Sequence, residues 1–292
     1  MGIVSGQRSA GLVKRTRAIG RVLIAAGRRY LAEDCLLFGA ALAYYAIFSL
    51  APVLVVVIAV AGFVFGTDAA QGYVFKELAG LVGADSAALI ERAVLAARVE
   101  PSSGLASLLA LGALIVGASG ALTTLSTALN HVFRPAQATG GLVAALRKRL
   151  LAVALLLTLG FLLLVSLVLS ALLQALAASL ESALGEIALL ADLANLFVGL
   201  LGVWAVSAAI LKWLPDRPVR WPHAVSGGLV AAILFTGGKQ LVGLYIGRAS
   251  VVSIYGAAGS LAVLALWMYY AAQAFLFGAA VAASASEAAR RS

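Results

Sequence analysis

Apolar residues run through this chain in long stretches that are almost free of charge. The stretch from Lys148 to Leu180 carries no charged residue after Arg149 and no proline. As an α-helix, residues 150–180 would extend roughly 45 Å, which exceeds the thickness of a bilayer core. A helix of a soluble domain would carry polar residues on its outward face, and this one carries almost none. The pattern therefore predicts a transmembrane helix.

Five further stretches show the same pattern. We therefore expect an all-α fold, an integral membrane helical bundle with six transmembrane helices, and we interpret residues 1–292 as a single transmembrane domain. Hydrophobic residues make up 63% of the chain and charged residues 11%, whereas soluble domains carry about 25% charged residues. The predicted spans are Phe38–Phe65, Leu105–Phe133, Leu150–Leu180, Leu193–Leu214, Ala224–Ile246 and Tyr255–Ala283.

The distribution of lysine and arginine predicts how these spans are oriented. Of the 21 Lys and Arg residues, 16 fall in the segments that six spans place on one side, and 4 fall on the other. Basic loops remain in the cytoplasm, so we expect both termini there, with residues 1–35 as a basic tail and 284–292 as a second tail. An alternative for the N-terminal tail is an interfacial helix that leads into the first span. The formal net charge of +9 then reflects orientation and attraction to anionic lipid headgroups.

The longest connection between spans, residues 66–104, is expected on the outer side. Its pattern predicts two short amphipathic helices, the second beginning after Asp85 and Ser86 and ending before Pro101. We favour helices that lie along the outer interface as a structural collar, and the alternative is a gate over an opening. Nucleic acid is not an expected partner, because no basic cluster is interleaved with aromatic residues.

Polar residues form a stripe in the second predicted span. Ser119, Thr123, Thr127, Asn130 and Arg134 recur at intervals of three or four and share one helical face. Unpaired polar groups in lipid are costly, so this face should meet other helices or a wet cavity. For the hydroxyls we favour bonds within the helix or to a neighbour, which are common in membrane proteins. Arg134 has the alternative reading of an interfacial anchor.

Lys239 is the clearest charge inside a predicted span. It lies next to Gln240, and Gly228 and Ala232 share its helical face. A lysine can extend its ammonium group to the interface, in which case it would be an anchor. The alternative is that it faces the bundle interior, where a charge is a candidate functional residue.

Polar groups and a proline also occur in the first and last spans. Tyr45, Ser49 and Pro52 share a face of the first span, and Pro52 frees a carbonyl group and bends a helix, so it is either a hinge or a packing kink. In the last span, Gln273 introduces an amide into apolar surroundings. The predicted substrate-binding residues are therefore Tyr45, Ser49, Thr123, Thr127, Asn130, Arg134, Lys239, Gln240 and Gln273.

The sequence gives no sign of an enzyme. The two histidines, His131 and His223, have no companion at metal-ligand spacing, and Cys35 is the only cysteine. There is no phosphate-binding loop and no nucleophile motif. We therefore expect no catalytic residue, no metal and no cofactor.

Several stretches, in order along nearly the whole chain from about residue 30, resemble a known family. The most specific motifs are the tyrosine–serine–proline pattern of the first span, the Leu214–Pro215 pair, and Ile254–Tyr255–Gly256 at the start of the last span. The chain resembles the YihY/virulence factor BrkB family of bacterial inner-membrane proteins. The stretches are Ala40–Pro52, Ala128–Arg134, Lys212–Phe235, Lys239–Ile246 and Ser253–Ala279.

The resemblance implies six spans in the bacterial cytoplasmic membrane. Members of the family have carried a ribonuclease BN label, which we reject here because metal-dependent RNA cleavage needs a cluster of histidines and acids. Many relatives have a glutamate where this chain has Ala280, so a role for that acid does not transfer. For relatives, links to envelope integrity and lipid export have been proposed.

The favoured function is passive or gradient-coupled movement of a phospholipid or a lipid-A-like molecule, with membrane lipids and envelope export proteins as partners. A headgroup that crosses the core needs polar groups along its path, while its tails stay in lipid. Asn130, Arg134 and Lys239 would supply them if they lined one furrow. The alternatives are a transporter of small solutes or ions, and a scaffold that transports nothing. The oligomeric state is not predicted.

Overall fold

The computed structural model describes residues 19–97, 120–134, 187–217, 219–246 and 257–291, and all regular elements in these ranges are α-helices. Two helices carry no label in the figures: the N-terminal helix, Ile19–Ala32, and the helix over 120–133. The others are α2 (Cys35–Phe65), α3 (Thr67–Val82), α4 (Ala84–Ala97), α7 (Ile187–Trp213), α8 (Trp221–Ile246) and α10 (Ala257–Arg291).

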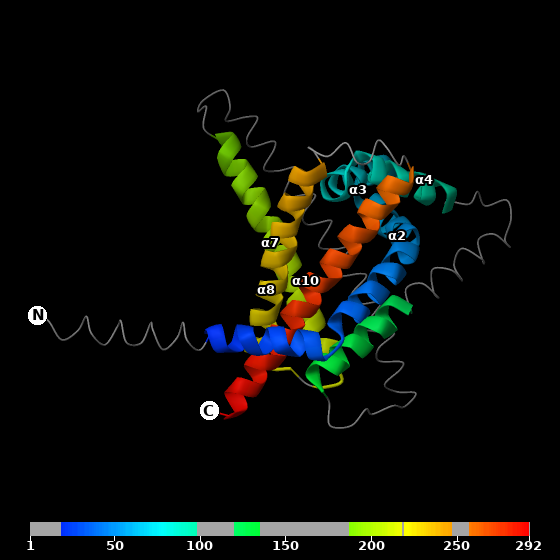
Figure 1. The fold of residues 1–292 in the computed structure, drawn as a ribbon. Coiled ribbons are helices and arrows are strands. Elements are labelled where there is room, and N and C mark those ends of the chain that lie inside the picture. Colours follow the sequence, from blue (N-terminus) through cyan, green and yellow to red (C-terminus); the bar gives the residue numbers. More distant parts are fainter. Residues whose placement is uncertain (1–18, 98–119, 135–186, 218, 247–256, 292) are drawn as a thin grey trace, which may run out of the picture.

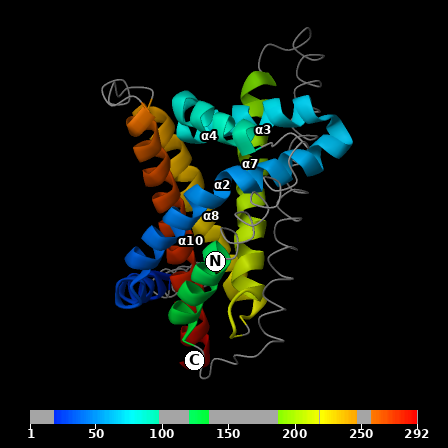
Figure 2. The same ribbon diagram turned by 90° about the vertical axis from the view of Figure 1, so that its right-hand side faces the viewer.

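The long helices pack side by side as a bundle. Helix α8 lies between α7 and α10, and α10 also packs against α2 (Figure 1). A quarter turn of the molecule shows α2 crossing α10 at a steep angle, with the helix over 120–133 beside it (Figure 2). We call the end with the N-terminal helix, the α7–α8 turn and the end of α10 the basic end. The opposite end, where α3 and α4 lie, is the capped end.

Glycines bring α8 into backbone contact with both neighbours. A Cβ atom added to Gly227 would lie 2.5 Å from the carbonyl oxygen of Gly278 in α10. One added to Gly228 would lie 2.8 Å from the backbone nitrogen of Ala208 in α7. Side chains larger than hydrogen would force these helices apart, so small residues set the distance between the three helices. Gly228 and Ala232, predicted to form a packing face, are both buried.

Helices α3 and α4 cover the capped end across α2, α8 and α10. They are the two helices that the sequence predicts within residues 66–104, of which 98–104 lie outside the described residues. Gly66 and Gly83, with φ of 83° and 84°, separate α2 from α3 and α3 from α4. An apolar cluster joins the cap to the bundle. It includes Ile58 and Leu54 of α2, Val74 and Phe75 of α3, Ile90 and Val94 of α4, and Trp267 of α10.

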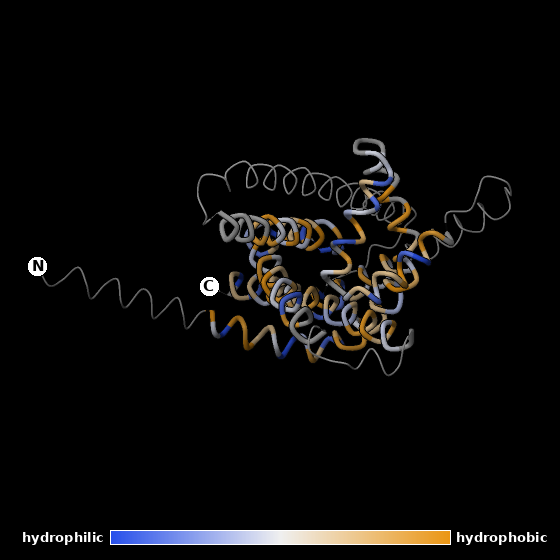
Figure 3. Tube along the Cα trace, turned by 90° about the horizontal axis from the view of Figure 1, so that it is seen from above, coloured by the Kyte–Doolittle hydropathy of each residue, from blue (hydrophilic) through white to orange (hydrophobic). Residues whose placement is uncertain are grey.

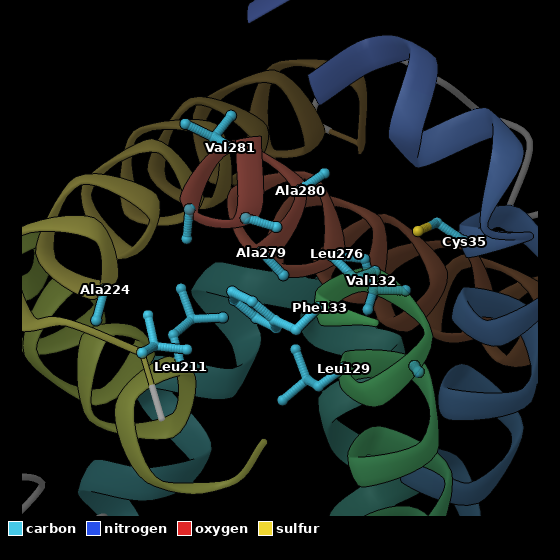
Figure 4. Packing of buried hydrophobic residues seen from close by; sticks show 14 of the residues in the cluster. Cys35, Leu129, Val132, Phe133, Leu211, Ala224, Leu276, Ala279, Ala280 and Val281 are labelled. Carbon is cyan, nitrogen blue, oxygen red and sulfur yellow. The ribbon is translucent and has the colours of Figure 1, made fainter. Parts of the chain in front are cut away.

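A second apolar cluster fills the basic end. Figure 4 shows the side chain of Phe133 lying between Leu211 and the residues of α10, with Cys35 at the margin. The N-terminal helix contributes the fully buried Ala26 and meets α2 at an angle of 68°. Residues 19–32, predicted to belong to a basic tail, therefore form a helix that packs on the core.

The predicted C-terminal tail, from residue 284, is also helical as far as Arg291, because it continues α10. Its alanine-rich sequence favours helix throughout. Ala280 is fully buried in the same cluster. The tail is therefore a helical extension of the last span rather than a separate segment.

Three helices are long and apolar enough to cross a membrane: Leu196–Trp213, Trp221–Leu241 and Gly259–Arg290. A fourth candidate is the bent pair formed by the N-terminal helix and Cys35–Ala51. The predicted span Leu150–Leu180 and the first part of Leu105–Phe133 lie outside the described residues. The membrane-protein fold is thus confirmed with three to four candidate spans among the described residues.

Candidate functional site

Asn130, predicted to face a groove, is held by the turn between α7 and α8. Its side-chain nitrogen donates to a carboxylate oxygen of Asp216 over 2.6 Å, and its side-chain oxygen accepts from the backbone N–H of Asp216 over 2.9 Å. Both halves of the amide are therefore used by one residue. This paired bond fixes the end of the helix over 120–133 against the α7–α8 turn.

Arg134 closes the same helix and pairs with an acid of another segment. Its backbone N–H donates to the carbonyl of Asn130 over 2.9 Å, and its φ of 46° ends the helix in a left-handed conformation. The guanidinium forms an ion pair with Glu33, just after the N-terminal helix. The arginine side chain is 61% exposed, whereas that of Glu33 is only 10% exposed.

Two more arginines bind the carbonyl groups that a helix leaves unpaired at its C-terminus. Arg29 of the N-terminal helix donates to the carbonyl of Val132 over 3.2 Å and forms an ion pair with Glu287 of α10. Arg217 of the α7–α8 turn donates to the carbonyl of Phe133 over 3.1 Å. The end of the helix over 120–133 is thus bonded to the N-terminal helix, to Glu33 just after it, and to the α7–α8 turn.

The threonines of the predicted stripe are exposed. The hydroxyl of Thr127 donates to the carbonyl of Thr123 in its own helix over 2.8 Å. Ser119 lies outside the described residues. The hydroxyl of Thr127 therefore makes the bond within the helix that the sequence analysis favoured.

Lys239 lies far along α8 from the group at the basic end. It is half-buried and follows the first residue of α8, Trp221, by 18 positions, which is about 27 Å at helical rise. Asn130 binds Asp216, which precedes α8. The structure therefore does not bring Asn130 and Lys239 together. Gln240, the neighbour of Lys239, is exposed.

The predicted residues of the first span lie on α2, at different depths of burial. Ser49 is buried and its hydroxyl donates to the carbonyl of Ala46 over 3.3 Å. The ring of Tyr45 lies against Gly120, where an added Cβ would come within 2.7 Å of it. Helix α2 continues through Pro52 as one element, so a hinge at this residue stays a prediction.

Gln273 of α10 joins three segments through its amide. Its side-chain oxygen accepts from the hydroxyl of Tyr30, in the N-terminal helix. Its side-chain nitrogen donates to the carbonyl of Leu36 at the start of α2 over 3.3 Å. A Cβ atom on Gly39 would collide with this amide, so glycine leaves room for it. The sequence predicted Gln273 as a candidate binding residue but indicated no partner for it.

A recess of about 480 Å³ opens at the basic end, and we call it the arginine recess. The N-terminal helix supplies most of its lining, including Arg21, Arg28 and Arg29, and Arg134 closes it from the helix over 120–133. Of these four arginines, the sequence analysis singled out only Arg134. The spacing of Arg21, Arg28 and Arg29, at intervals of seven and one, was the available signal for a basic helical face.

Among the described residues, no three histidine, cysteine, aspartate or glutamate side chains lie together as a metal site. The polar residues instead join helices or line the arginine recess. Together with the long apolar helices, this arrangement places the protein among the helical integral membrane proteins.

Residues 26–292 match the sequence family described as Virulence factor BrkB, so the chain belongs to that family. A UPF0761 membrane protein of Verminephrobacter eiseniae is 32% identical over 262 residues, which are 87% of this chain and 60% of that protein. One of Delftia acidovorans is 33% identical over 174 residues, which are 58% of this chain and 39% of that protein. The chain thus spans at most about 60% of the length of these curated relatives. No solved structure matches the chain.

Proposed function

We propose that the protein moves an anionic lipid, a phospholipid or a lipid-A-like molecule, between the leaflets of the bacterial cytoplasmic membrane or toward an envelope export partner. Movement is passive or coupled to a gradient, and the protein is not an enzyme. The proposal includes six spans, both termini in the cytoplasm and the basic end at the cytoplasmic surface. Residues 105–133 and 150–180 would supply the spans beyond the four candidates.

One observation carries the proposal: cationic groups lie at two levels of the bundle that are separated by about one bilayer core. Trp213 and Trp221 pack edge to face at the basic end, where aromatic residues of membrane proteins mark the interface. Lys239 lies about 27 Å further along α8, and a bilayer core is about 30 Å thick. A lipid phosphate would meet Arg134 at one headgroup level and Lys239 at the other.

Removing the charge of Lys239 tests this proposal. We expect Lys239→Met to abolish lipid flipping in proteoliposomes that contain a fluorescent phosphatidylglycerol. A quencher is added outside the vesicles, and loss of flipping lowers the fraction of the fluorescence that it removes. Insertion and folding should be unchanged, since methionine fits both a lipid-facing and a buried position. The matched control is Lys76→Met, which removes an exposed lysine of α3 at the capped end and should leave flipping at the wild-type rate. Equal flipping by Lys239→Met and the wild type would reject the proposed role.

A scaffold that transports nothing is the second candidate, and a specific observation favours it. Asn130, Arg134 and Thr127 are bonded to Asp216, Glu33 and Thr123, so three residues of the predicted stripe already have protein partners. Such bonds stabilise the fold instead of binding a lipid headgroup during transport. If purified wild-type protein flips no lipid in vesicles of any anionic composition, the scaffold becomes the preferred function.

A further inference from the structure

The N-terminal helix presents three different faces. Val22, Ala26 and Tyr30 pack against the bundle core. Arg21 and Arg28 point into the arginine recess, on the neighbouring face. Ile24 also lines this recess, and Leu23 and Leu31 are exposed elsewhere on the helix, with Leu31 66% exposed. In the view along the bundle, hydrophilic and hydrophobic residues alternate along this helix at the edge of the molecule (Figure 3). A basic helix of this kind, with a free apolar side, lies in the plane of a membrane interface.

The four arginines of the recess differ in how far their charge is already balanced. Arg29 pairs with Glu287, and Arg134 pairs with Glu33. Arg21 and Arg28 are exposed, and within the described part of the chain no acidic side chain forms an ion pair with either of them. The recess therefore keeps about two uncompensated positive charges beside two guanidinium groups that are held in place.

We propose that the arginine recess binds the phosphate of an anionic phospholipid from the leaflet next to the basic end. Guanidinium groups donate paired hydrogen bonds that match phosphate oxygens. Ile24 and Ala25 line the same recess, and exposed Leu31 lies one helical turn from Arg28, so apolar surface for acyl chains adjoins the charged surface for the headgroup. This combination favours a lipid over a soluble phosphate. The proposal goes beyond transport, because a lipid is held here whether or not it is moved.

The test uses the full chain in nanodiscs of equal amounts of phosphatidylglycerol and phosphatidylcholine, with the lipids that remain bound counted by native mass spectrometry. We expect wild-type protein to retain phosphatidylglycerol selectively. Each basic group near an anionic surface contributes about fivefold to binding, so the double variant R21Q/R28Q should lose about 30-fold in selectivity. Both side chains are exposed and form no ion pair with an acidic residue of the described ranges, so folding should be unaffected.

The matched control is the double variant K76Q/R92Q, which removes two exposed basic residues of α3 and α4 at the capped end. It should retain phosphatidylglycerol at the wild-type ratio. Equal losses in both double variants would overturn the proposal, because they would show attraction by net charge alone. Unchanged selectivity in R21Q/R28Q would overturn it as well. If that variant does not fold, the single variant R28Q is measured, with a loss of about fivefold expected.

A second arm separates a lipid from a soluble anion. Inorganic phosphate added at 50 mM should displace no more phosphatidylglycerol than sodium chloride of equal ionic strength. Displacement by phosphate alone, with the same dependence on Arg21 and Arg28, would assign the recess to a soluble phosphate and overturn the lipid proposal. Selective lipid retention together with no flipping would support the recess and reject the transport function, so the two proposals fail separately.

Discussion

Both ends of the bundle contain an apolar cluster, but they differ in the directed polar bonds that accompany it. At the basic end, directed polar bonds join segments far apart in sequence, such as Asn130 with Asp216 and Arg29 with Glu287. At the capped end, α3 and α4 are held mainly by an apolar cluster that includes Ile58, Val94 and Trp267. One buried polar bond adds to this cluster, between the hydroxyl of Ser86 and the carbonyl of Ser260 over 3.0 Å.

The difference bears on what each end can do. Apolar packing is non-directional and tolerates small shifts of one helix over another. Paired hydrogen bonds fix both the distance and the orientation of their groups. The basic end therefore holds the guanidinium groups of Arg29 and Arg134 in fixed positions, as a binding site requires. The capped end is a cover positioned mainly by apolar packing, with one directed bond from Ser86.

The largest expected effect is at the backbone contact between α8 and α10. Gly227→Ala places a methyl group 2.5 Å from the carbonyl oxygen of Gly278, and backbone cannot move aside as a side chain can. We expect a loss of about 3 kcal/mol in the free energy of unfolding, measured by denaturant titration in detergent. Gly237→Ala, on the same helix, is the control, because nothing lies within 4 Å of its added Cβ. It should be neutral or stabilising by about 0.5 kcal/mol. Equal effects of the two would contradict the backbone contact.

A smaller loss is expected when the paired bond at the basic end is broken. Asn130→Ala removes two hydrogen bonds, one to the side-chain carboxyl group of Asp216, and should cost about 2 kcal/mol. The double variant with Asp216→Ala should cost less than the sum of the single variants, because both single variants break the bond between the Asn130 amide and the Asp216 carboxylate. Additive losses in this cycle would show that the two residues stabilise the fold independently.

At the capped end the corresponding substitution should matter less. Ser86→Ala removes one hydroxyl bond and should cost about 1 kcal/mol, seen as faster hydrogen exchange in α4. Ser126→Ala is the matched control, because the buried hydroxyl of Ser126 has no hydrogen-bond partner in the described structure. Its removal should be neutral or stabilising by about 1 kcal/mol. A cost for Ser86→Ala equal to that of Asn130→Ala would remove the contrast between the two ends.

The sequence predicted the helices better than their partners. Long apolar runs identify α7, α8 and α10 because a span must be apolar over its whole length. Periodicity also placed Asn130 and Arg134 on one polar face, but it carries no information about which segment meets that face. Asp216 is 86 residues from Asn130, and Glu287 is 258 residues from Arg29. Such pairings follow from the packing of the whole bundle.

For the same reason, a furrow lined by both Asn130 and Lys239 was a hypothesis that the sequence could not test. Each was recognised as a polar residue in an apolar run, whereas their relative depth depends on how the helix over 120–133 meets the α7–α8 turn. The sequence predicts the N-terminal helix as part of a tail, because seven Lys and Arg residues lie between residues 8 and 29. Its apolar residues Val22, Ala26 and Tyr30 recur every four positions, which was the signal for a packing face.

The smallest expected effect is that of a substitution at Thr127. This substitution tests whether the polar face at the basic end stabilises the fold or contacts a transported lipid. Its hydroxyl is exposed and bonded within its own helix, so Thr127→Val should change the free energy of unfolding by less than about 0.5 kcal/mol. Valine keeps the size and branching of the side chain, and flipping should remain within about twofold of the wild-type rate, whereas Lys239→Met is expected to abolish it. Reduced flipping by a Thr127→Val protein of unchanged stability would mean that a headgroup contacts this hydroxyl during passage. The polar face of the helix over 120–133 would then line the lipid path as well as join the bundle.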